Sequence, residues 1–191
     1  SVEDLRGWKE HRKGEFCFEG GLSSFVSYMN EAHSVLHDPV RISGECEQED
    51  EGLLIIDVAI QYNKAFQEDI FSFVNNINTI DGGTHLSGLK SALTRTINEY
   101  ASANNLYNRK GISFSGSDVR EGPAAVISVK VPDPQFEGQT KTRLGNSNVQ
   151  GAVFSHVIRG LSTYLEEHPS VARRIVQKCN VNNSSRQAAK K

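Results

Sequence analysis

A run of five polar residues in the second half of the chain, Gln139 to Arg143 (QTKTR), could bind an anion. Its amide and hydroxyl groups donate neutral hydrogen bonds, and Lys141 and Arg143 add fixed positive charge. The run lies in a loop, Pro132 to Asn148, between a strand pattern and a helix pattern, a setting in which binding residues are common. These donors suit a phosphate or a carboxylate. The alternative is a solvated, mobile connection whose charges have no ligand.

A second stretch, Asp81-Gly82-Gly83-Thr84, comes directly before a helix pattern. Glycine permits backbone angles that other residues avoid, and Thr84 is a suitable N-cap. Two glycines before a helix could cradle a phosphate at the helix N-terminus. The spacing matches neither GxGxxG nor a P-loop, so a structural turn is the competing interpretation.

No residue spacing indicates a metal site. The chain has three cysteines, Cys17, Cys46 and Cys179. Their odd number and wide separation argue against a disulfide framework and against a zinc site. His33 and His37 could meet on one helix face, but Pro39 and the loop composition around them disfavour a helix. We therefore predict no metal ligand and a reducing, cytoplasmic setting.

The composition of the 191 residues is typical of a soluble globular protein, with 37% hydrophobic and 23% charged residues, which excludes a disordered chain. The formal net charge of -2 gives no global attraction to nucleic acid. No run of about 18 apolar residues is present, so we predict no membrane partner. The charges are uneven, because five acids lie between Glu45 and Glu51, whereas the chain after Glu167 carries bases and no acid.

Hydrophobic periodicity predicts how these residues are positioned. Alternation typical of strands covers the segments 41–49, 53–62, 70–74 and 124–131, and a further short strand is indicated at 15–18. On the second of these strands the alternating apolar residues share one face and should line the core. These are Leu54, Ile56, Val58, Ile60 and Tyr62.

Helix patterns separate and follow the strands. One of about ten residues begins at Leu22, one runs from Thr84 to Tyr100, and one of about 20 residues includes Val149. Pro169 ends that helix and a last helix follows. Asn182-Asn183-Ser184-Ser185 has the composition of a linker.

Three blocks of the sequence resemble the DNA gyrase B family, and specifically its second, transducer domain. They are EGGLSSFVSYMN (Glu19 to Asn30), DGGTHLSGLKSALTRTINEY (Asp81 to Tyr100) and DVREGPAAVISVKVPDPQFEGQTKTRLGN (Asp118 to Asn146). The similarity covers nearly the whole chain in the right order. The B chain of topoisomerase IV, which serves decatenation, is a close rival. Pro123 departs from the family pattern, where an aliphatic residue is expected, and should disturb the following strand little.

The resemblance implies an α/β (α+β) fold, a ribosomal-protein-like domain whose four-stranded sheet is backed by helices, with a left-handed βαβ crossover and long C-terminal helices. Such a crossover hand is rare. In this family the matching loop reaches into a neighbouring ATP-binding domain. Gln139 and Lys141 would then contact the γ-phosphate of ATP, with Lys141 as the catalytic charge. Lys90 and Arg95 would line the cavity that DNA passes through.

The resemblance also implies a domain organisation. Residues 1–14 would be a linker from an ATP-binding domain, 15–146 the transducer domain, 147–180 C-terminal helices and 181–191 a linker or tail. Because the chain opens on Ser1 rather than methionine and its start is highly charged, we expect an excised fragment that neither hydrolyses ATP nor cuts DNA alone.

In the full protein the resemblance implies an ATP-hydrolysing type II DNA topoisomerase, an isomerase that couples ATP binding and hydrolysis to strand passage and negative supercoiling. ATP and Mg²⁺ would be its cofactors, with neither bound by this fragment alone. Its partners would be DNA, the gyrase A protein, a second copy of gyrase B, and the upstream ATP-binding and downstream cleavage domains of the same chain.

Two alternatives from other functional classes remain at this point. One is a non-catalytic scaffold for DNA binding or dimerisation, in which the basic C-terminal helix makes the contact. The other is a coupling domain of a related ATPase, as in mismatch-repair or chaperone proteins. DGGTH together with FEGQTKTRLGN argues against the latter.

Overall fold

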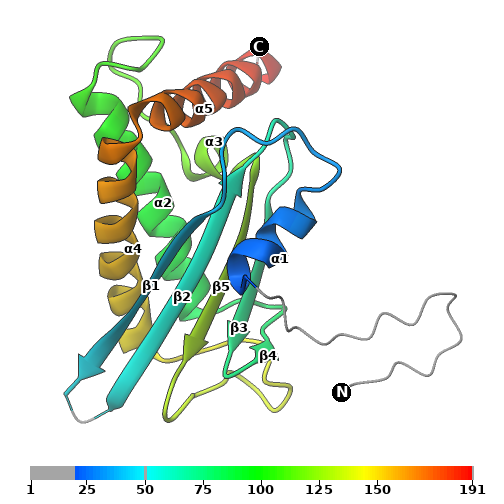
Figure 1. Ribbon diagram of the computed structural model, residues 1–191, viewed down its shortest axis with the longest axis vertical. Helices are drawn as coiled ribbons and strands as arrows, with labels where there is room; N and C mark the ends of the chain where they lie inside the picture. Colours follow the sequence, from blue (N-terminus) through cyan, green and yellow to red (C-terminus); the bar gives the residue numbers. More distant parts are fainter. Residues whose placement is uncertain (1–19, 50, 191) are drawn as a thin grey trace, which may run out of the picture.

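A computed structural model describes residues 20–49 and 51–190. The expected linker 1–14 and the expected strand at 15–18 therefore lie outside the described residues. Within the described part, helices pack on a central sheet (Figure 1).

The sheet has five strands in the order β1-β2-β5-β3-β4. They are β1 (Val40–Gln48), β2 (Gly52–Tyr62), β3 (Asp69–Val74), β4 (Ile77–Asn78) and β5 (Pro123–Lys130). Neighbouring strands are antiparallel except β3 and β5, which are parallel. The chain crosses from β3 to β5 through the helix α2 (Thr84–Ala103). The left-handed βαβ crossover predicted from the sequence is this β3–α2–β5 connection. Its handedness stays a prediction.

The fifth strand corrects the expected four-stranded sheet. Asn75 and Asn76 have positive φ angles of 48° and 66°, and they turn the chain so that Ile77–Asn78 pairs with β3. Asparagine tolerates this conformation better than most residues, and paired positive φ angles are typical of tight hairpin turns. A two-residue strand is too short to leave a periodic pattern. Pro123 opens β5, a position where proline is tolerated.

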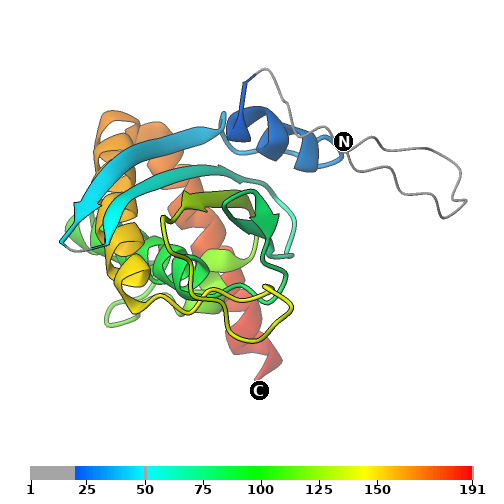
Figure 2. The ribbon, with the colours of Figure 1, turned by 90° about the horizontal axis from the view of Figure 1, so that it is seen from below.

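Helices cover both faces of the sheet (Figure 2). The short helix α1 (Leu22–Met29) packs on one face, where Val26 meets small residues of β2 and β5, Ala59, Ala124 and Val126. The long helices α2 and α4 (Ser147–Glu167) pack together against the other face. The helices α3 (Gly116–Arg120) and α5 (Pro169–Ala189) complete this layer.

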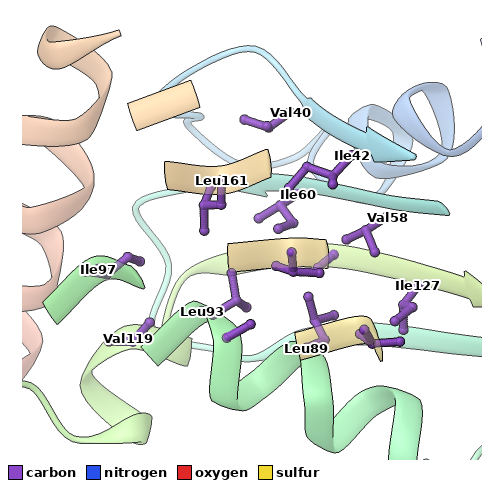
Figure 3. Packing of buried hydrophobic residues seen from close by; sticks show 14 of the residues in the cluster. Val40, Ile42, Val58, Ile60, Leu89, Leu93, Ile97, Val119, Ile127 and Leu161 are labelled. Atoms are coloured by element: carbon purple, nitrogen blue, oxygen red, sulfur yellow. The ribbon is translucent and has the colours of Figure 1, made fainter. Parts of the chain in front are cut away.

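The predicted alternation along β2 is confirmed, because all five of its alternating apolar residues are buried. Figure 3 shows Val58 and Ile60 of this strand facing Leu89 and Leu93 of α2 and Leu161 of α4. The packing of β-branched strand residues against helical leucines forms the main core. The candidate loop runs into the start of α4 and is hydrogen-bonded to the start of α2.

The C-terminal tail differs from its predicted conformation, because α5 continues as a helix to Ala189. Asn182 is buried, and its amide donates to the backbone carbonyls of Asp118 and Glu121, at 2.8 Å each. Arg186 forms ion pairs with the same two residues, at 2.6 Å to Asp118 and 2.7 Å to Glu121. These tertiary contacts stabilise a helix in a segment with linker composition. The division of the chain into domains stays a prediction.

Both ring nitrogens of His37 have structural partners. Nδ1 lies 2.5 Å from the carbonyl of Asp38, and Nε2 accepts the amide of Tyr62 at 2.9 Å. Burial lowers the pKa of His37, in keeping with a neutral ring. In the part of the chain that the structure describes, no group of three potential ligands could hold a metal ion. No described helix is long and apolar enough to cross a membrane.

Candidate functional site

The polar run lies at the tip of a hairpin-like loop. The Glu137 amide donates to the Arg143 carbonyl at 2.9 Å, and the Gly145 amide donates to the Gln135 carbonyl at 2.7 Å. These bonds pair the two arms of the loop and leave residues 138–142 as its tip. Gly138, with φ of 80°, supplies a backbone turn that favours glycine. The loop is thus a built element rather than an unstructured connection.

The returning arm of the loop is docked on the Asp81–Thr84 stretch. The Leu144 amide donates to the Gly82 carbonyl, and the Leu144 carbonyl accepts from the Thr84 amide, both at 3.1 Å. Farther along, the Asp81 amide donates to the Thr142 carbonyl at 3.0 Å. The two stretches that the sequence singled out therefore form one structure.

Gly83 is the position at which the two segments approach most closely. A Cβ atom there would lie 2.4 Å from the carbonyl oxygen of Leu144 and 2.5 Å from its nitrogen. The φ of Gly83 is 134°, which also favours glycine. Because the Thr84 amide is occupied by Leu144, the glycines favour the structural-turn interpretation over a phosphate cradle.

The side chain of Leu144 is fully buried, although the loop around it is polar. Its backbone is bridged to Phe136 on one side and to Gly83 on the other. Asn146 fixes the base of the loop, since its side chain accepts from the Gln135 amide at 2.7 Å and donates to the Asp133 carbonyl at 3.1 Å. Sequence reasoning missed both anchors, and the signal for Leu144 was a lone large apolar residue among polar ones.

The two cations of the loop have different surroundings. Arg143 pairs with Glu137 at 2.9 Å and donates to the Asp81 carbonyl at 3.0 Å. Lys141 is exposed at the tip with φ of 54°, and no carboxylate of the described residues pairs with it. Gln139 is exposed beside it. Arg143 thus stabilises the loop through its contacts with Glu137 and Asp81, and Lys141 and Gln139 are exposed where a ligand could bind.

The structure does not bring Lys90 and Arg95 together. Lys90 pairs with Glu68 at 2.5 Å, and Glu68 also pairs with Arg120 at 3.1 Å. Burial acts to raise the pKa of Glu68, but its two cationic partners outweigh it and lower that pKa. Arg95 instead pairs with Glu99 at 2.6 Å, with its guanidinium 5.8 Å from the ring centre of Phe154 on α4. Each cation is therefore offset by a carboxylate, and their contact with DNA stays a prediction.

A buried polar cluster supports the N-terminus of α2 beneath the loop. His85 is fully buried, and its Nε2 lies 3.0 Å from the hydroxyl of Thr79. The Thr79 hydroxyl also lies 2.9 Å from the Ser72 carbonyl, so a chain of polar contacts runs from the ring to β3. Desolvation lowers the pKa of His85 to about 4. A neutral, fixed imidazole thus joins α2 to β3.

Two of the four basic residues of α5, Lys178 and Arg186, are engaged within the fold, whereas Arg173 and Arg174 are exposed. The Lys178 ammonium lies 3.7 Å from the ring centre of Phe66 and donates to the Lys64 carbonyl at 3.3 Å. Arg186 pairs with Asp118, which is only 1% exposed. This helix consequently presents fewer free charges than its sequence suggests, which weakens the case for a DNA-binding scaffold.

Comparison with known proteins gives the family. The family model described as DNA gyrase B matches residues 21–191. The chain belongs to the DNA gyrase B family. The predicted resemblance is confirmed by relatives named as the B subunit of DNA gyrase, one from Halalkalibacterium halodurans that is 47% identical over 100% of the chain, and one from Myxococcus xanthus that is 49% identical over 100%.

The chain spans only part of these gyrase B relatives, 29% of the first and 22% of the second. A solved structure of the 43K ATPase domain of Thermus thermophilus gyrase B has a TM-score of 0.81 and 35% identity. It covers 90% of this chain and 45% of that one. The topoisomerase IV ATP-binding domain of Francisella tularensis has a TM-score of 0.73 and 31% identity, covering 88% and 44%. Both neighbours have the mixed α/β fold seen here.

Proposed function

We propose that this chain is the transducer domain of a DNA gyrase B protein, part of an ATP-dependent type II DNA topoisomerase. In that role it couples ATP binding and hydrolysis in a neighbouring domain to DNA strand passage and negative supercoiling. One observation carries the proposal: a loop tip whose ammonium pairs with no carboxylate of the described residues is hydrogen-bonded through Leu144 to the start of α2 and runs directly into α4. The charged group and the helices that would move with it are thus one continuous structure.

The tip residues fit a phosphate that is presented from outside the chain. Gln139 offers a neutral amide donor and Lys141 an exposed ammonium, which is the combination of direction and charge that phosphate oxygens need. Bound ATP would supply the γ-phosphate whose negative charge redistributes during hydrolysis. Lys141, already positioned by the paired arms of the loop, would stabilise that charge without reorganising solvent.

Magnesium would be held by the ATP-binding domain rather than by this chain. The described residues contain no group of three side chains able to hold a metal ion, and the loop tip carries an amide, two hydroxyls and an ammonium rather than carboxylates. Mg²⁺ prefers carboxylate and phosphate oxygens. The donor set of the tip therefore suits the phosphate and not its metal.

Loss of the phosphate would release the tip, and α2 and α4 would carry that change away from the nucleotide. Both helices pack on the same face of the sheet and on each other, so a shift at their shared N-terminal end reorients them together. The movement would reach DNA, the gyrase A protein and a second copy of gyrase B through the rest of the protein. Lys90 and Arg95 would line the DNA cavity.

The B chain of topoisomerase IV is the alternative within the same enzyme class. Relatives that are 47% and 49% identical to this chain are named as the B subunit of DNA gyrase. The gyrase B structure also exceeds the topoisomerase IV structure in TM-score, 0.81 against 0.73. These differences favour the gyrase assignment.

The deciding experiment replaces Lys141 by alanine in this chain fused to its ATP-binding domain. We expect ATPase turnover to fall by about a hundredfold or more, as when one preorganised electrostatic group is removed. Lys130→Ala is the matched control, since Lys130 is exposed at the end of β5, before the loop. Its turnover should stay near that of the unsubstituted fusion. Unchanged turnover in Lys141→Ala, with intact folding by circular dichroism, would sink the assignment.

A further inference from the structure

The first strand of the sheet has one free edge beside a groove. β1 is the last strand in the order of the sheet and pairs only with β2 among the described strands. It lies next to α4 (Figure 1). A groove of about 550 Å³ opens there between residues 45–49 and Glu51 of the β1–β2 hairpin and residues 148–159 of α4. Backbone groups on a free strand edge are available to pair with another chain.

The wall of the groove on the α4 side combines three small residues with Asn148, His156 and, at its far end, the cation Arg159. Gly151, Ala152 and Ser155 line it, and a Cβ added at Gly151 would meet no atom within 4 Å. His156 also lines the groove, and its Nε2 is buried with no hydrogen-bond partner among the described residues. The groove therefore has open space beside Gly151 and a buried ring nitrogen with no partner among the described residues.

The charges of β1 lie on the side of the strand away from α4. Gly44 faces α4, because a Cβ there would lie 2.2 Å from the His156 ring, and Ile42 faces Gly160 of α4 in the same way. Successive side chains on a strand point to opposite faces, so Glu45 and Glu47 point to the other face. A strand paired with this edge would thus meet carboxylates on one face and small residues on the other.

We propose that the free edge of β1 binds an extended, lysine- or arginine-rich segment of a partner protein as an added strand. Its basic residues would alternate with small ones, the former opposite Glu45 and Glu47 and the latter against Gly151 and Ala152. Opposite charges directly across a strand pair are favourable, and backbone pairing adds affinity that is independent of side chains. The same carboxylates repel nucleic acid, so this face excludes DNA.

The test uses the 191-residue chain and a synthetic peptide of alternating lysine and alanine, about seven residues long so that it can span the strand edge. Fluorescence anisotropy should show saturable binding that weakens with salt. Glu45→Lys with Glu47→Lys should weaken binding by at least about tenfold. The matched control is Glu166→Lys with Glu167→Lys, on exposed residues at the far end of α4, which should change binding by less than about twofold.

Two further measurements separate strand addition from simple charge attraction. A fully N-methylated form of the peptide keeps its charge but has no backbone donor, and it should not bind. Gly151→Phe fills the groove and should abolish binding, whereas Thr163→Phe, on an exposed residue of α4 outside the groove, should leave it intact. Equal binding of the methylated peptide, or no binding of either peptide, overturns the proposal. ATPase turnover is not a readout here, so this outcome is separate from that for Lys141.

Discussion

The contact between Gly83 and Leu144 gives a specific prediction for stability. In Gly83→Ala the new Cβ would lie within 2.8 Å of the oxygen, nitrogen and Cα of Leu144, and backbone atoms cannot rotate away as a side chain can. The docked arm must therefore separate from the start of α2. Two hydrogen bonds are lost, at about 1 kcal/mol each, and alanine at a φ of 134° adds about 1 kcal/mol or more.

We expect Gly83→Ala to lower the free energy of unfolding by about 3 kcal/mol, measured by urea denaturation of the 191-residue chain. Gly151→Ala is the control, because that glycine lies within α4 with open space around it, and it should stabilise the chain by up to about 1 kcal/mol. Leu144→Ala should cost about 3 kcal/mol alone but less in the Gly83→Ala background, where the leucine is already displaced. Equal stability of the two glycine variants would refute the docking argument.

Two further predictions concern groups outside the loop. The pKa of His85 should be near 4 when measured by NMR. Because this folded-state pKa lies below the unfolded value, the contribution of His85 to stability is complete above about pH 6.5. About 3 kcal/mol of the free energy of unfolding is then lost as the pH falls to 4. A His85 titration near pH 6.5 in the folded chain would contradict its burial. Arg186→Ala should destabilise the chain by about 2 kcal/mol, because the carboxylate of Asp118 is buried and loses its charged partner. Arg173→Ala, on an exposed residue of the same helix, should change stability by less than about 0.5 kcal/mol, and comparable losses in both variants would argue against the Asp118 contact.

Most strands of the sheet were predictable from the sequence because apolar residues recur at every second position along them. The alternation predicts that Val58 and Ile60 face the core, and both side chains are buried. The strand β4 was missed because it is a consequence of two asparagines at positive φ, not of an apolar pattern. A segment of two residues has no period to detect.

The last turns of α5 show where composition fails. Asn182 and Ser185 are typical of linkers, yet Asn182 is 1% exposed and bonded to two carbonyls of the α3 region. A side-chain amide that finds such partners stabilises a helix that its own propensity does not favour. Only the tertiary fold brings those partners within reach.

The sequence identified the polar residues of the candidate site but not the contacts that hold the loop in place. Residue types identified the whole run Gln139 to Arg143 as donors. The family resemblance implies the γ-phosphate of ATP as the ligand of Gln139 and Lys141, and that contact stays a prediction. Neither source shows that Gly83 and Leu144 touch, because that contact joins segments 61 residues apart through a backbone approach open only to glycine. Nor does the sequence distinguish Arg143, which pairs with Glu137, from Lys141, which is exposed at the loop tip.

Hydrogen exchange of two backbone amides in the docked arm would report how often the loop separates from α2. The amides of Thr84 and Leu144 are both hydrogen-bonded across the contact, so their protons exchange with solvent only when the arm separates from the helix. Their exchange rates, relative to those of amides deep in β2, would give the free energy of that opening event directly. Under the proposed function, a nucleotide whose phosphate holds the tip would slow these two amides while leaving the core unchanged.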